Sequence, residues 1–282
     1  MLRSPGMATA KKKAPTDGPP RNDPDFMVSL ARGLSVIRAF GDGQKPLSVA
    51  DVAALTGLSR AASRRCLHTL SVLGYAHRDN STYELTPTIL ALGYAYVGST
   101  ALTRAAQPIL ERVSEQLHES SSLAVLDGDE IVYVARAATR RILSIGLAVG
   151  TRLPAFCTSM GRVLLANLDD ETRKRYLARV KLVAHTPRTV TDRAELRGVL
   201  DKVRTQHFAL VDQELELGLR SIALPIHDGQ GHVVAAVNVG VHVGRGDART
   251  LEREFLPVLR EAASEISALL SPGRPRTTHK TR

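Results

Sequence analysis

The chain has 282 residues, a hydrophobic content of 43% and a formal net charge of +10, which allows two domains and is ordinary for a globular protein. No apolar run approaches the roughly 18 residues needed to span a bilayer, and the basic cluster Lys11–Lys13 is not followed by the apolar segment of a signal peptide. Two cysteines argue against a disulfide scaffold and are typical of a reducing compartment, so we expect a cytoplasmic protein that does not enter a membrane.

The excess positive charge lies at the two ends of the chain, whereas the long middle region is nearly neutral. This distribution favours a nucleic-acid-binding end joined to a body with another task. Residues 1–24 are rich in Lys, Pro, Gly and Asp and poor in hydrophobic residues, so we expect a disordered tail there. Residues 271–282 form a short basic tail.

A first helix is expected from Phe26 to Phe40, because apolar residues recur there at helical spacing. The Gly41-Asp42-Gly43 sequence would end it. The residues predicted to face inward are Leu30, Leu34, Val36 and Ile37.

Residues 48–73 have the pattern of a short helix, a tight turn and a longer helix. Gly57 can adopt the left-handed conformation that ends a helix, and Ser59 is a favourable N-cap for the next one. In that second helix the inner face is predicted to carry Ser63, Cys66, Leu67, Leu70 and Leu73, and the outer face Arg60, Arg64, Arg65 and His68.

A helix with arginines on its outer face is either a solvated surface helix or a helix that reads DNA. Three details favour DNA: no acidic residue lies between Ser59 and Leu73, the turn is short and ends in an N-cap, and a hairpin around Asp79-Asn80-Ser81 follows. The order is that of a winged helix-turn-helix domain over residues 25–86, whose second helix enters the major groove. The predicted DNA contacts are Ser59, Arg60, Ala61, Arg64, Arg65, His68 and Arg78.

Residues 87–102 are predicted to form a linker helix that begins at Thr86 or Pro87. No charged residue lies between Thr86 and Leu102, and Ile89 to Val97 gives an apolar and aromatic surface. This helix either docks on its own domain or packs against its copy in a dimer, and we favour the dimer.

Residues 103–270 alternate between helical and strand patterns in an order typical of an α+β domain with a mainly antiparallel sheet. Helices are expected over 102–117, within 154–168, and over 172–180, 192–205 and 251–270. Strands are expected over 121–126, 130–135, 142–149, 208–210, 221–227 and 233–241.

Motifs for phosphate binding, redox chemistry and metalloproteases are absent from the sequence. His227, His232 and His242 lack cysteine or carboxylate neighbours at metal-ligand spacing, so we predict no metal and no cofactor. Cys157, near a helix start, is either a thiol of lowered pKa or a small packing residue.

Two segments are candidates for a ligand pocket without catalysis. In Phe156–Arg162, the amides of Met160 and Gly161 at a helix start could face an anion. Asp212–Ser221 clusters acids, an arginine and a serine just before an apolar strand, which suits either a small-molecule site or a charged surface loop.

Three stretches in order, TGLSRAASRRCLHTLSVLGYA, RLPAFCTSMGRVLLA and DQELELGLRSIALPIHDGQGHVVAAVNVG, resemble the signatures of IclR-type bacterial transcriptional regulators over about residues 26–270. The resemblance implies a winged helix-turn-helix, a linker helix, a GAF-like effector-binding domain, and homodimers or dimers of dimers. The CTSMGR form, preceded by Arg152-Leu153-Pro154, resembles the branch that senses aromatic acids and β-ketoadipate-pathway intermediates.

Carried over by position, this resemblance predicts the effector contacts. They are Ser159, Met160, Gly161, Asp212, Glu214, Ser221 and Asn238. The residue pattern adds Thr158, which precedes the helix start, and Arg152, an arginine that could pair with a carboxylate. Arg136 and Arg162 are further candidates to pair with a carboxylate, since a guanidinium can bind it through two hydrogen bonds.

The sequence therefore predicts a regulator that binds a pseudo-palindromic operator as a dimer and responds to a small carboxylate. The alternative is an enzyme that acts on an aromatic acid and carries a fused DNA-binding module. A third class, a nucleoid protein without sequence preference, is disfavoured by the neutral middle domain.

Overall fold

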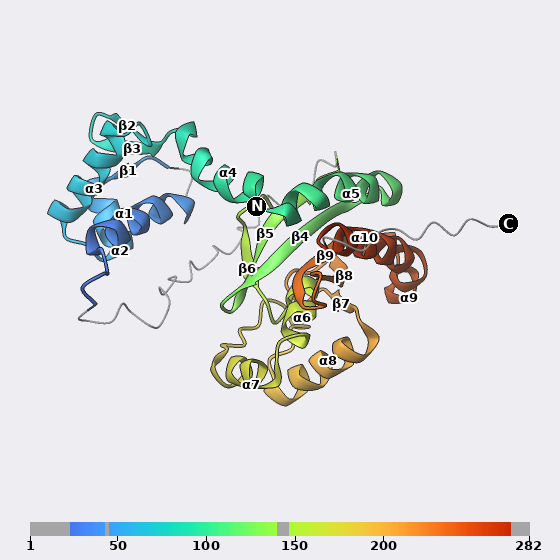
Figure 1. Ribbon diagram of the computed structural model, residues 1–282. Coiled ribbons are helices and arrows are strands. Elements are labelled where there is room, and N and C mark those ends of the chain that lie inside the picture. Colours follow the sequence, from blue (N-terminus) through green and yellow to red (C-terminus); the bar gives the residue numbers. More distant parts are fainter. Residues whose placement is uncertain (1–22, 43–44, 140–146, 272–282) are drawn as a thin grey trace, which may run out of the picture. The chain divides into compact units, whose positions relative to one another are not determined.

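The computed structural model describes residues 23–42, 45–139 and 147–271. The chain divides into two compact units, Met1–Leu92 and Gly93–Arg282, which are seen in Figure 1. Within the described ranges, no helix combines the length and the apolar character needed to cross a membrane.

The first unit is a small helical domain with a three-stranded wing. Its helices are α1 (Val28–Ala39), η1 (Phe40–Asp42), α2 (Val49–Thr56) and α3 (Arg60–Val72), and its strands are β1 (Leu47–Ser48), β2 (Ala76–Asp79) and β3 (Thr82–Leu85). The strands are antiparallel in the order β1-β3-β2. The core consists of Val36, Val52, Leu67, Leu70, Ala76 and Tyr83.

Local signals explain the two helices that form the helix-turn-helix. Ser48 and Asp51 form a capping box at the start of α2, in which each side chain accepts a hydrogen bond from the other residue's backbone N–H. Gly57 ends α2 in the left-handed conformation, with φ of 73°. The Ser59 hydroxyl then accepts a hydrogen bond from the Ala62 N–H at 3.2 Å and caps α3. The predicted winged helix-turn-helix is confirmed.

Three of the residues predicted to face inward in this unit are exposed instead. Leu30 is 58% exposed, Leu34 43% and Leu73 61%. The C-terminal half of α1 packs into the small core, where Val36 is buried and Ile37 is partly buried. Leu73 is the C-cap of α3, and the chain turns away at Gly74, so the helical spacing no longer applies to it.

The linker segment is helical, as predicted. It comprises η2 (Pro87–Ile89) and α4 (Leu90–Ser99). Its apolar side chains Leu90, Leu92 and Tyr96 are 70%, 51% and 48% exposed.

The second unit is built on a curled six-stranded sheet. Its strands are β4 (Ser120–Asp127), β5 (Glu130–Ala137), β6 (Arg152–Pro154), β7 (Ala209–Asp212), β8 (Leu219–His227) and β9 (Val233–His242). They lie in the order β6-β5-β4-β9-β8-β7, and every neighbouring pair is antiparallel. The α+β class with an antiparallel sheet is confirmed.

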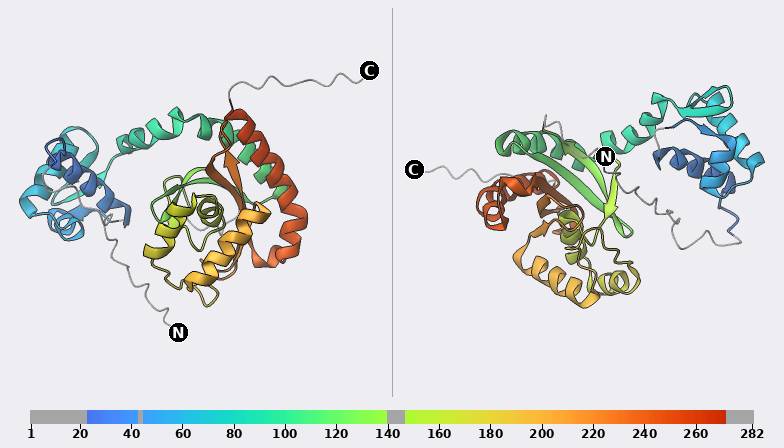
Figure 2. Two further views of the ribbon diagram at one scale, coloured as in Figure 1. Left: turned by 60° about the horizontal axis from the view of Figure 1, so that its bottom comes forward. Right: turned by 180° about the vertical axis from the view of Figure 1, so that it is seen from behind.

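Helices cover both faces of this sheet (Figure 2). One face packs against α5 (Ala101–Leu117) and α10 (Leu256–Leu269), the latter preceded by η3 (Val243–Arg245), α9 (Ala248–Thr250) and the π-helical turn η4 (Leu251–Phe255). The concave face packs against α6 (Ser159–Ala166), with α7 (Asp170–Arg179) and α8 (Arg193–Gln206) beyond it. Two apolar cores result, one on each side of the sheet.

The strand predicted over 142–149 is wrong where it can be tested. Residues 140–146 lie outside the described ranges, and residues 147–149 lead into a turn at Gly150, whose φ is 90°. The strand begins later, at Arg152, where it pairs with Val132. A glycine in the left-handed region marks a turn rather than a strand continuation.

Candidate functional site

The outer face of α3 is open to solvent. All seven residues predicted to contact DNA are exposed, whereas Ser63, Leu67 and Leu70 on the opposite face are buried. Arg60, Arg64 and Arg65 form no ion pair with any described residue. Their guanidinium groups are therefore available to phosphates or base edges.

The wing carries one further arginine of the predicted set. Arg78 Nε donates a hydrogen bond to the backbone oxygen of Asn80 at 3.0 Å, and its guanidinium lies 5.9 Å from the centre of the Tyr83 ring. These contacts hold the side chain against the hairpin of β2 and β3.

The start of α6 is packed more tightly than a simple anion cradle. The Thr158 hydroxyl donates to the backbone oxygen of Pro154 at 3.0 Å and accepts from the Gly161 N–H at 3.3 Å. A Cβ atom on Gly161 would lie 2.1 Å from the Ala155 oxygen, so only glycine fits there. Met160 is a core residue, 1% exposed. The Ser159 hydroxyl is buried and has no hydrogen-bond partner among the described residues.

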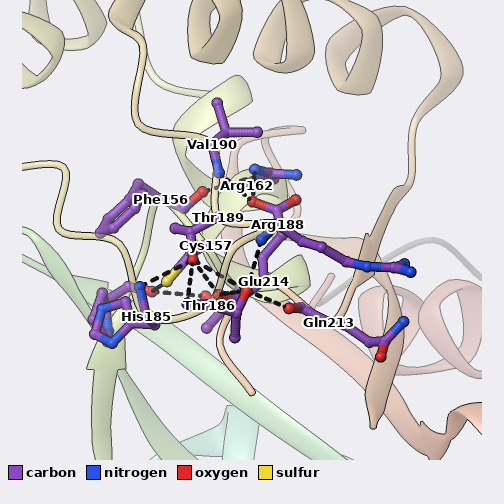
Figure 3. Close-up of polar contacts among 12 residues, drawn as sticks. Phe156, Cys157, Arg162, His185, Thr186, Arg188, Thr189, Val190, Gln213 and Glu214 are labelled. Carbon is purple, nitrogen blue, oxygen red and sulfur yellow. Dashed lines mark hydrogen bonds and ion pairs between the residues drawn. The ribbon is translucent and has the colours of Figure 1, made fainter. Parts of the chain in front are cut away.

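Glu214 and Arg162 form a buried ion pair beside this helix (Figure 3). Arg162 Nη2 lies 2.6 Å from Glu214 Oε2, and the two side chains are 4% and 9% exposed. Arg162 Nε also donates to the Phe156 oxygen at 2.9 Å, and the Val190 N–H donates to Glu214 Oε2 at 3.1 Å. The Thr189 hydroxyl donates to the backbone oxygen of Glu214 at 2.6 Å. These bonds join α6 to two long loops.

Asp212 is likewise engaged by arginines. Its carboxylate lies 2.9 Å from both Arg188 and Arg220. Burial raises the pKa of the Asp212 carboxyl, but hydrogen bonds from Arg220 and Gln213 and the charges of both arginines outweigh it, so the pKa lies below its usual value. Asp212 is therefore an anion held by cations of its own domain.

The three arginines considered for carboxylate binding differ in what they contact. Arg152 forms ion pairs with Asp127 and Glu130, both at 2.7 Å, and Arg162 is paired with Glu214. Arg136, by contrast, donates through Nη1 to the Ser122 hydroxyl at 3.3 Å and has no carboxylate partner among the residues described.

The strand register brings four polar residues together on the concave face of the sheet. Arg136 on β5 is opposite Ser122 on β4, and Ser122 is opposite Asn238 on β9. Ser221 on β8 is opposite Gly240, two residues from Asn238. Side chains directly opposite in an antiparallel pair lie about 5 Å apart. Asn238 is 8% exposed, and its Oδ1 has no hydrogen-bond partner in the described part of the chain.

Ser122 was missed by the sequence reasoning. It lies in the run Ser120–Ser122, where three serines in succession give no polar–apolar alternation that would single it out, although the period of two in a strand places Ser120 and Ser122 on one face. The partner strand could not be read from the sequence, since the register pairs Ser122 with Asn238 across more than a hundred residues.

Cys157 is a packing residue. It is buried, and burial together with the Glu214 charge raises the pKa of its thiol to about 12, so it is not a reactive thiolate. Across the described ranges, no three His, Cys, Asp or Glu side chains gather as metal ligands.

Comparison with known proteins gives matches over both units. The model of the bacterial transcriptional regulator IclR C-terminal domain matches residues 94–268, and the IclR helix-turn-helix domain matches residues 29–80. The chain is 53% identical over 245 residues to the Pca regulon regulatory protein of Pseudomonas putida, covering 86% of this chain and 84% of that protein. It is 38% identical over 251 residues to the p-hydroxybenzoate hydroxylase transcriptional activator of Acinetobacter baylyi, covering 87% and 93%.

A solved structure extends the likeness to the whole architecture. An IclR homologue from Microbacterium hydrocarbonoxydans, complexed with 4-hydroxybenzoate, aligns with a TM-score of 0.74 and 28% identity over 86% of this chain and 98% of that one.

Proposed function

Since the chain belongs to the IclR family of bacterial transcriptional regulators, we propose that it controls promoters as a dimer on a pseudo-palindromic operator and responds to a small aromatic carboxylate. Such a protein acts where the bacterial DNA is, in the cytoplasm. The proposal has three parts: the DNA contacts, the effector site and the dimer.

The DNA contacts are proposed from the exposed arginines of α3. Arg60, Arg64 and Arg65 are exposed and unpaired among the described residues, and no acid lies on that helix. A guanidinium suits both phosphates and the guanine edge in the major groove.

The effector site is proposed on the concave face of the sheet, and one observation carries it. The Asn238 amide is 8% exposed yet has an oxygen without a partner among the described residues. A buried polar atom left unpaired costs about 1–3 kcal/mol, so it is expected where a ligand supplies the missing bond. Ser159 has a second such atom.

The aromatic-acid class is proposed from the relatives. One is a p-hydroxybenzoate hydroxylase transcriptional activator, and a structural relative is complexed with 4-hydroxybenzoate. A carboxylate also suits the arginine on this face, Arg136. Both Asp212 and Glu214 are held by arginines, so we propose that they shape the site and do not accept a hydrogen bond from the effector.

The dimer is proposed from apolar surface that the chain leaves exposed. Leu90, Leu92 and Tyr96 on α4 are about half exposed or more, and no charged residue lies from 86 to 102. Apolar side chains gathered on an uncharged helix are expected to be covered by a partner. A two-fold dimer would place two α3 helices on half-sites about one DNA turn, or a multiple of it, apart.

The enzyme alternative has no support. The relatives are named as transcriptional regulators, and the thiol near α6, Cys157, is buried with a raised pKa.

A thermal-shift screen of the full chain against hydroxybenzoates and dicarboxylates tests the effector class. A ligand present at 100 times its dissociation constant adds about 2.7 kcal/mol to stability, which should raise the Tm. The same acids should change the affinity for promoter DNA in a gel-shift titration, because an effector acts only if it favours one state of the protein. The proposal is contradicted if none of the acids raises the Tm, or if none of them alters the affinity for DNA.

A further inference from the structure

We infer that Arg136 is the residue that pairs with the effector's carboxylate, at one end of a polar row formed by Arg136, Ser122, Asn238 and Ser221. This inference rests on the proposed function, since it assumes a carboxylate effector on the concave face. It replaces Arg152, which the sequence favoured for this role.

The other two candidate arginines, Arg152 and Arg162, are already neutralised by acids of the chain. Arg152 contacts two carboxylates and Arg162 contacts one, all within 2.7 Å. Freeing Arg162 for a ligand would leave Glu214 as a buried and unpaired charge, which is strongly unfavourable. An effector that displaced Glu214 would have to overcome that cost.

Arg136 itself has no carboxylate partner among the described residues. Its one side-chain hydrogen bond among the described residues goes to the neutral Ser122 hydroxyl, and burial lowers the pKa of its guanidinium. An arginine stays charged at any physiological pH. A partly buried cation without an anion is costly, and a carboxylate removes that cost through charge-assisted bonds.

The face of the sheet around Arg136 combines polar side chains with small ones. Neighbouring strands are about 4.8 Å apart, so the row from β5 to β8 crosses three such steps in the register of the sheet. The positions beside it carry small side chains, namely Ala124, Ala223 and Gly240. Small side chains thus flank the polar ones on this face, and the unpartnered Asn238 oxygen lies next to Ser122 in this row.

Acids on the α5 side of the sheet do not neutralise Arg136. The residue also borders a cavity of about 290 Å³ beside α5, where Glu111 and Glu115 are found. Glu111 accepts a hydrogen bond from Gln107, and the charged group that acts on Arg136 is Tyr133 and neither of these acids. The guanidinium instead reaches Ser122 and the neighbourhood of Tyr133, on the α6 side.

The test is calorimetry of the full chain with 4-hydroxybenzoate and with its neutral analogue 4-hydroxybenzamide. Wild type should bind the acid at least tenfold more tightly than the amide. Arg136→Gln should lose that preference, so that acid and amide bind within threefold of each other. Arg136→Lys should keep a partial preference, because a lysine supplies the charge but not the two-bond geometry. Arg112→Gln, which removes an exposed arginine of α5, is the matched control and should behave as wild type.

The outcomes separate the inference from the proposed function. If wild type binds the acid and Arg136→Gln keeps the full preference for acid over amide, the inference is overturned and the effector class stands. If wild type binds neither the acid nor a panel of other aromatic acids and dicarboxylates, the effector class is overturned together with the inference. Circular dichroism and the Tm show whether each variant is folded. If Arg136→Gln does not fold, the comparison of acid with amide is made on Arg136→Lys.

Discussion

Breaking the buried ion pair between Arg162 and Glu214 should strongly destabilise the second unit. In Arg162→Met the apolar chain fills a similar volume, but the Glu214 carboxylate keeps only its bond from the Val190 N–H. Because both partners are less than 10% exposed, the remaining carboxylate cannot be hydrated without opening the loops around it. Removing one partner of a buried pair costs about 3–5 kcal/mol.

This cost can be converted into a melting temperature. For a domain of 150–250 residues, each 1 kcal/mol lowers the Tm by roughly 2–4 °C, so Arg162→Met should lower it by roughly 6–20 °C. The double variant Arg162→Met/Glu214→Gln should recover a large part of the loss, because the neutral amide can still accept the Val190 bond and no buried charge remains.

Differential scanning calorimetry on a second, exposed ion pair of the same length shows whether burial or distance sets the cost of losing one partner. Arg179 and Asp129 also lie 2.6 Å apart, but their side chains are 57% and 45% exposed. Arg179→Met should therefore cost at most about 1 kcal/mol. Equal Tm losses for Arg162→Met and Arg179→Met, or no recovery in the double variant, would refute the view that burial sets the cost.

Three further predictions concern the other features of the chain. Arg64→Ala and Arg65→Ala should each weaken operator binding by about 1–3 kcal/mol if the arginine reads a guanine; gel shifts that match wild type for both would reject α3 as the recognition helix. Tyr96→Asp should shift the protein towards monomers in light scattering, since it places a charge on the exposed apolar face of α4; an unchanged dimer mass argues against α4 as the interface. Cys157, with a thiol pKa of about 12, should be about one part in ten thousand thiolate at pH 8 and resist a thiol reagent until denaturant is added. The less buried Cys66 should react faster in the native protein, and labelling of both cysteines at similar rates would contradict the difference in burial.

Much of the fold could be read from local sequence, because the signals that start and stop elements act within a few residues. Ser48 with Asp51, Gly57 and Ser59 set the bounds of α2 and α3 through hydrogen bonds and one left-handed φ. Helical spacing likewise predicted the helix over 102–117, which the structure has as α5 with Ile109 and Leu110 buried. Alternation identified the strands on either side of each hairpin. The resemblance to the IclR family also rested on short stretches of local sequence.

The tertiary structure alone decided how far each apolar face is covered and which charges meet. Helical spacing placed Leu30 and Leu34 on the inner face together with Val36, but a core as small as that of the first unit covers one half of α1 and leaves the other half exposed. In the sequence, Arg136, Arg152 and Arg162 were all candidates to pair with a carboxylate, and Arg152 was favoured. Their difference arises because sheet register and loop packing bring acids to two of them and a serine to the third, and such long-range pairing has no local signal in the sequence.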